Sequence, residues 1–104
     1  MVGEIPKPLY FAVKQRVPLS ATVTRHHQRR VIGILSIVTR RTSYRNDGLN
    51  IAAYRFRELI DAGIVTRDVA EGLLLDAATL CGYVAKDGEA AAMRTIRSGL
   101  GIGH

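Results

Sequence analysis

The sequence predicts an all-α fold, a small bundle of three to five helices formed by one domain that spans residues 1–104. Two observations carry this prediction. Apolar residues recur at intervals of three and four, which is the period of one helical face, in three well-defined segments. Capping residues or glycines bound these segments, and the connections between them are short, as in bundles whose consecutive helices pack as neighbours.

The first 40 residues are the uncertain part of this bundle. Residues 1–8 contain one glycine and two prolines and are expected to form an extended lead-in. Residues 9–17 are apolar at first and basic later, and Pro18 disfavours helix at the residue before it. We interpret residues 9–17 as a short helix, with a strand as the alternative.

Residues 25–38 form the next segment. Periodicity favours a helix, although the valines and isoleucines would also suit a strand. Three arginines crowd its first turns, where positive charge opposes the helix dipole. The possible N-caps are Ser20, Thr22 and Thr24. The residues on its common face are His27, Val31, Ile34, Leu35 and Val38.

Residues 45–50 read RNDGLN and open the best-defined helix of the chain. Asn46 or Asp47 is expected to be the N-cap, because a short side-chain oxygen accepts from free N–H groups of the first turn. Gly63 is placed to end this helix, since it enters the left-handed conformation without steric cost. The apolar face consists of Leu49, Ala52, Ala53, Phe56, Leu59 and Ile60.

Two further helices follow. Thr66 is the expected N-cap of a helix that ends at Gly82, residues 83–86 are expected to be a connection, and Asp87 is the expected cap of the last helix. The inward-facing residues of these two helices are Val69, Leu73, Ala77 and Leu80, and then Met93, Ile96 and Leu100. The glycines expected to let the C-terminus fray are Gly99, Gly101 and Gly103.

The charge of the chain is unevenly distributed. Its net charge is +6, but residues 1–57 hold eleven Lys or Arg and two acids, a charge of +9, whereas residues 58–104 carry −3. A half with so few compensating acids favours a polyanionic partner. Nucleic acid is the first choice, and an anionic membrane or an acidic protein is the second.

Motifs for enzymatic chemistry are missing. The sequence has no phosphate-binding Gly-Lys-Ser/Thr motif, no Cys-x-x-Cys or His-Glu-x-x-His pattern and no nucleophile elbow. We therefore expect no catalytic residue, no metal site and no cofactor. Cys81 is the only cysteine and cannot form an internal disulfide, which suits a reducing cytoplasm. No apolar run is long enough to span a bilayer, and with nucleic acid preferred we expect no membrane partner.

Arginines surround the start of the central helix and recur elsewhere on the predicted helix surfaces. Guanidinium forks, amide side chains and free N–H groups suit phosphate oxygens. Arg57 adds charge to the central helix but is expected on a different side from Arg55. Asn46 is a weaker candidate, because capping would already explain it. The candidate nucleic-acid-binding residues are Arg25, Arg29, Arg30, Arg40, Arg41, Arg45, Asn50, Arg55, Arg94 and Arg97.

Four short motifs between residues 40 and 101 carry a family resemblance. They are RNDGLNIAAYRF at residues 45–56, AGIV at 62–65, LLDAA at 74–78 and TIRSGL at 95–100. In order and spacing they resemble the helical C-terminal accessory segment of phage- and plasmid-type bifunctional primase-polymerase replication proteins. Residues 1–39 have no counterpart in that segment. The acidic metal-binding motif of the catalytic primase-polymerase domain and the Walker motif of a helicase are both absent from the sequence.

The resemblance implies a non-catalytic helical module, encoded by a phage, prophage or mobile element, that binds nucleic acid during replication priming. Single-stranded DNA is the favoured partner, and a primase or helicase is the alternative one. Two other functions stay open: a helix-turn-helix regulator formed by residues 66–81 and 88–98, and a protein that binds or inhibits a replication enzyme. A homodimer is compatible with all three functions, because a small helical domain can need extra burial. The expected location is the cytoplasm of a bacterium or phage-infected host.

Overall fold

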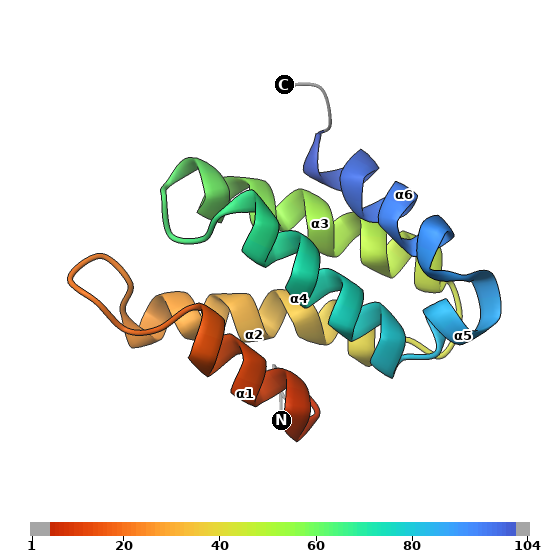
Figure 1. Cartoon of the computed structure of the whole chain (residues 1–104), viewed down its shortest axis with the longest axis horizontal. Coiled ribbons are helices and arrows are strands. Elements are labelled where there is room, and N and C mark those ends of the chain that lie inside the picture. Colours follow the sequence, from red (N-terminus) through yellow and green to blue (C-terminus); the bar gives the residue numbers. More distant parts are fainter. Residues whose placement is uncertain (1–4, 102–104) are drawn as a thin grey trace.

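The computed structural model describes residues 5–101, and all regular secondary structure in this range is helical (Figure 1). The all-α prediction is therefore confirmed, with one helix more than the largest number expected. The helices are α1 (Lys7–Arg16), α2 (Arg25–Thr39), α3 (Arg45–Asp61), α4 (Arg67–Leu80), α5 (Tyr83–Asp87) and α6 (Glu89–Leu100).

The long helices pack in two layers. Helices α2 and α3 run antiparallel to each other, and α4 lies across both of them (Figure 1). Helices α1 and α6 flank α4 on opposite sides, so that α4 touches every other helix. The molecule is correspondingly flat, with principal extents of 39 × 34 × 19 Å.

The core forms where the predicted apolar faces meet. The five residues of the α3 face from Leu49 to Leu59 are buried, and Phe56 is the largest fully buried side chain. The apolar face of α2 and most of that of α4 are also buried, as their helical spacing predicts. On α4, Val69 is only partly buried, and the side chain of Leu80 at the end of the helix is exposed.

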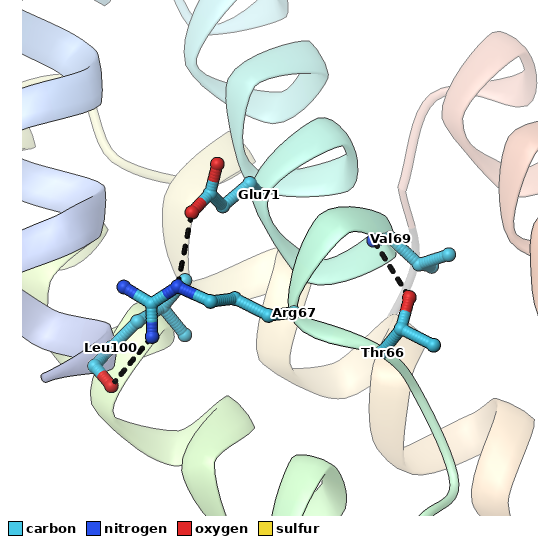
Figure 2. Close-up of polar contacts among 5 residues, drawn as sticks. All are labelled: Thr66, Arg67, Val69, Glu71 and Leu100. Carbon is cyan, nitrogen blue, oxygen red and sulfur yellow. Dashed lines mark hydrogen bonds and ion pairs between the residues drawn. The ribbon is translucent and has the colours of Figure 1, made fainter. Parts of the chain in front are cut away.

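Capping explains why α2 begins where it does, despite its unfavourable positive charge. Thr24 Oγ1 accepts a hydrogen bond from the His27 N–H, and His27 Nδ1 accepts one from the Thr24 N–H at 3.0 Å. This reciprocal capping box satisfies two donors of the first turn. Thr66 caps α4 as expected, accepting from the Val69 N–H at 3.2 Å (Figure 2). Gly63, the expected terminator of α3, has a φ of 76° just beyond the end of that helix.

Three expected boundaries were wrong. Lys7 and Pro8 belong to α1 and not to an extended lead-in, because proline is tolerated in a first helical turn; residues 1–4 of that lead-in lie outside the described range. Residues 83–86 belong to α5 and are not an irregular connection. Gly88, with a φ of 92°, precedes α6 in place of the expected cap Asp87.

The start of α3 also differs from the expectation. Its N-cap is Tyr44, which has a left-handed φ of 53° and makes no side-chain cap. Asn46 and Asp47 instead lie in the first helical turn. The Asn46 side chain is turned toward α5 and α6, where its Oδ1 accepts from the Tyr83 hydroxyl at 2.9 Å and from the Thr95 hydroxyl at 2.6 Å. Asn46 is therefore a tertiary contact and not a cap.

Helix α6 packs unusually close to α3. A Cβ on Gly99 would lie 2.5 Å from the Cβ of Ala53 and 2.7 Å from the carbonyl oxygen of Asn50. Because Thr95 meets Asn46 and Gly99 meets the following turns of α3, the two helices run parallel (Figure 1). Gly99 is thus a buried packing residue within α6; Gly103 lies outside the described residues.

Candidate nucleic-acid interface

A hollow of the described surface lies over the exposed side of α3. It has a volume of about 1100 Å³, and its walls come from α2, α3, α4 and the end of α6. Four arginines line it, and we call it the arginine hollow. Those arginines are Arg30, Arg55, Arg57 and Arg67. Asn50, Ile51 and Tyr54 also line it, together with the two acids Glu58 and Asp61.

Three of the ten residues predicted from the sequence meet in this hollow. Asn50 and Arg55 come from exposed positions of α3, and Arg30 reaches them from the neighbouring α2. The Arg30 guanidinium pairs with Glu58 across the two helices, with Nη1 2.8 Å from Oε1. The antiparallel packing of α2 on α3 therefore brings the beginning of α2 beside the second half of α3, a proximity that sequence spacing does not reveal.

Arg57 and Tyr54 are two hollow residues that the predicted site lacked. Helical spacing placed Arg57 on a different side of α3 from Arg55, but both long side chains reach the hollow. The Arg57 guanidinium carbon lies 5.2 Å from the centroid of the Tyr54 ring. Tyrosine and arginine three residues apart on a helix are neighbours, and that spacing was the signal available in the sequence.

Arg67 is the third hollow residue that the predicted site lacked, and Figure 2 shows how it is held. Its Nε pairs with the carboxylate of Glu71 at 3.2 Å, one turn later on α4. Its Nη1 donates to the main-chain carbonyl of Leu100 at 3.5 Å, near the end of α6. The positive charge of an arginine at the first position of a helix opposes the helix dipole. Such an arginine is expected to have partners elsewhere in the fold, and its position was the signal available in the sequence.

The loop between α2 and α3 forms a second, shallower hollow of about 460 Å³. Arg40 and Arg41 line it, together with Tyr44, whose side chain is 76% exposed. The aliphatic part of the Arg41 side chain lies over Gly48: a Cβ on that glycine would be 3.0 Å from Arg41 Cδ. The predicted pair Arg40 and Arg41 is thus kept together, but at a site separate from the arginine hollow.

The remaining predicted residues join neither hollow. Arg45 is half-buried, and its Nε donates to the main-chain carbonyl of Cys81 at 3.0 Å. Arg94 and Arg97 are exposed on α6, and Arg25 and Arg29 are exposed at the beginning of α2. The structure therefore divides the predicted site into separate surfaces.

Metal-binding groups and membrane-spanning helices are two further features to consider in residues 5–101. No three His, Cys, Asp or Glu side chains within this range are grouped so that they could hold a metal ion. None of the helices formed by these residues has the length and apolar character needed to cross a membrane.

Comparison with known proteins identifies no relative of this chain. No protein-family model matches the chain, and no curated protein or solved structure matches it significantly.

Proposed function

We propose that this protein is a non-catalytic module that binds single-stranded nucleic acid during the replication of phage or mobile-element DNA. The arginine hollow is the observation that supports the binding role. Four guanidinium groups and an exposed tyrosine share one concave surface, as a single strand requires for its phosphates and bases. The connection to replication priming rests on the four motifs that resemble the accessory segment of primase-polymerases.

The charge of the hollow decides how strongly it should bind. Its four arginines outnumber its two acids, and Glu58 is paired with Arg30. Binding should then be modest and sensitive to salt, because each phosphate contact releases a counterion from the strand. With Arg30 held by Glu58, engagement of the other three arginines gives a slope of about −2 for the logarithm of the association constant against that of the salt concentration.

Fluorescence anisotropy with a labelled single-stranded oligonucleotide at several salt concentrations tests this proposal. Arg55→Gln should weaken binding and make the salt slope shallower by about 0.7, since Arg55 is exposed in the hollow. Lys86→Gln is the matched control, because it removes one positive charge from an exposed position of α5 outside the hollow. No binding at low salt, or tight binding that ignores salt, would overturn the proposal.

A helix-turn-helix regulator fits the structure less well. The two helices of such a motif are joined by a turn of three to four residues, whereas α5 intervenes between α4 and α6. The hydroxyl of Thr95, one of the side chains that would read the DNA groove, donates to Asn46.

Docking on a replication enzyme is the other alternative. It predicts co-purification with that enzyme and little nucleic-acid binding by the isolated protein.

A further inference from the structure

We infer that the ring of Tyr54 is a stacking platform for one unpaired nucleobase, so that the arginine hollow binds a nucleotide unit and not phosphate charge alone. This inference rests on the proposed function and specifies its ligand. It makes the base, and not only the backbone charge, responsible for the preference for single strands.

The placement of Tyr54 is the first support for this inference. Its side chain is 61% exposed although it belongs to a well-packed helix. Its neighbours Ala52, Ala53 and Phe56 occupy the buried side of α3, so the tyrosine ring is directed away from the core. An aromatic side chain that lies outside the protein core, on a concave surface, offers a flat apolar face to a ligand.

The surroundings of the ring are the second support. The guanidinium of Arg57 lies over one face of the ring, with its carbon 5.2 Å from the ring centroid, and leaves the other face for a base. Ile51, one turn earlier on α3 and partly exposed, adds an apolar edge beside it. Asn50 also lines the hollow and offers amide donor and acceptor groups to a base edge. Arg55 on α3 and Arg30 on α2 also line the hollow, and their guanidinium groups suit the flanking phosphates.

The size of the hollow agrees with such a ligand. Sites for small molecules occupy about 300 to 1,000 Å³, and this hollow reaches about 1100 Å³. It therefore has room for at least one complete nucleotide. A base enters it only when it is unstacked from its neighbours, which a duplex resists and a single strand allows.

Another tyrosine provides a matched control. Tyr10 on α1 is also exposed and also has a cation over its ring, with the Lys14 ammonium 5.3 Å from the centroid. Tyr10 lies in neither hollow and instead packs edge-on against Phe11. The two tyrosines thus share their chemistry and differ in their surroundings.

The experiment compares two labelled strands of equal length, one of thymidines and one whose sugars lack bases, by fluorescence anisotropy. The two strands have the same phosphates, so any difference comes from the bases. We expect the thymidine strand to bind about 5- to 150-fold more tightly, the range of one base–aromatic stack. Tyr54→Ala should abolish that preference and leave binding of the abasic strand unchanged, whereas Tyr54→Phe and Tyr10→Ala should retain it.

A second measurement uses the absence of tryptophan from the sequence. Tyr54→Trp introduces a single indole, whose fluorescence should be quenched by the thymidine strand and not by the abasic one. Equal, salt-sensitive binding of both strands would overturn the stacking platform and leave the proposed function intact. Failure of both strands to bind would overturn both. Retention of the preference by Tyr54→Ala would also refute the platform.

Discussion

Nε of Arg45 donates a hydrogen bond to the main-chain carbonyl of Cys81, 36 residues further along the chain, at 3.0 Å. Cys81 follows the last residue of α4, where the carbonyls of a helix lack partners within it. A guanidinium is well suited to this place, because positive charge is favourable at the C-terminal end of the dipole. Arg45 therefore joins the beginning of α3 to the end of α4.

The first prediction concerns this bond. Arg45→Gln should lower the free energy of unfolding by about 1 to 2 kcal/mol, since the half-buried Cys81 carbonyl loses a charge-assisted donor. Chemical denaturation measures this loss. Arg94→Gln is the control, because Arg94 is exposed on α6 and its replacement should stay within about 0.5 kcal/mol of wild type. A fully stable Arg45→Gln variant that no longer binds nucleic acid would show that Arg45 serves a ligand instead.

The second prediction concerns the acceptor that Asn46 provides. Asn46→Leu should cost about 1 kcal/mol of stability, because the hydroxyls of Tyr83 and Thr95 lose this acceptor and keep only their contact with each other at 3.1 Å. Asn46→Asp is the informative control. A carboxylate accepts from both hydroxyls, and negative charge suits the first turn of α3, so this variant should be as stable as wild type or more stable. Equal destabilisation by the two substitutions would contradict the assignment.

The interpretation of residues 45–50 shows what the sequence could and could not predict. Periodicity predicted the buried face of α3, because the order of residues along a helix alone decides which side chains share a face. The partners of Arg45 and Asn46 lie 36 to 49 residues away, so no local rule leads to them. The same limit applies to the hollow: Arg30 and Arg55 were predicted separately, but only the packing of α2 on α3 brings them together.

The third prediction concerns the close packing of Gly99 on α3. Gly99→Ala should destabilise the protein by about 1 to 3 kcal/mol, because the new methyl group would overlap Ala53 and the Asn50 carbonyl. The matched control is Gly33→Ala in α2, where nothing lies within 4 Å of the new Cβ. There the better helix propensity of alanine should stabilise the protein by about 0.5 to 1 kcal/mol. Thermal unfolding of the two variants should therefore give midpoint shifts of opposite sign.

The fourth prediction concerns the competition between Glu58 and a phosphate for Arg30. Glu58 Oε1 and Arg30 Nη1 are 2.8 Å apart, and the side chains are 72% exposed for Glu58 and 39% exposed for Arg30. An exposed pair of this kind contributes at most about 1 kcal/mol to stability, so Glu58→Gln should unfold like wild type. Without the carboxylate, Arg30 is free to contact a phosphate of a strand bound in the hollow, and the affinity of that strand should rise by up to about fivefold.

Salt titration distinguishes this release of Arg30 from a general increase in positive charge. Freeing one arginine adds a phosphate contact, so the slope for Glu58→Gln should become steeper by about 0.7. Glu89→Gln makes the same change of charge at an exposed position of α6 outside the hollow. Because Glu89 lies in the first turn of α6 and pairs with no arginine in the described part of the chain, its replacement should leave the slope unchanged. Equal effects of the two variants would mean that the carboxylate of Glu58 does not hold Arg30 away from the strand.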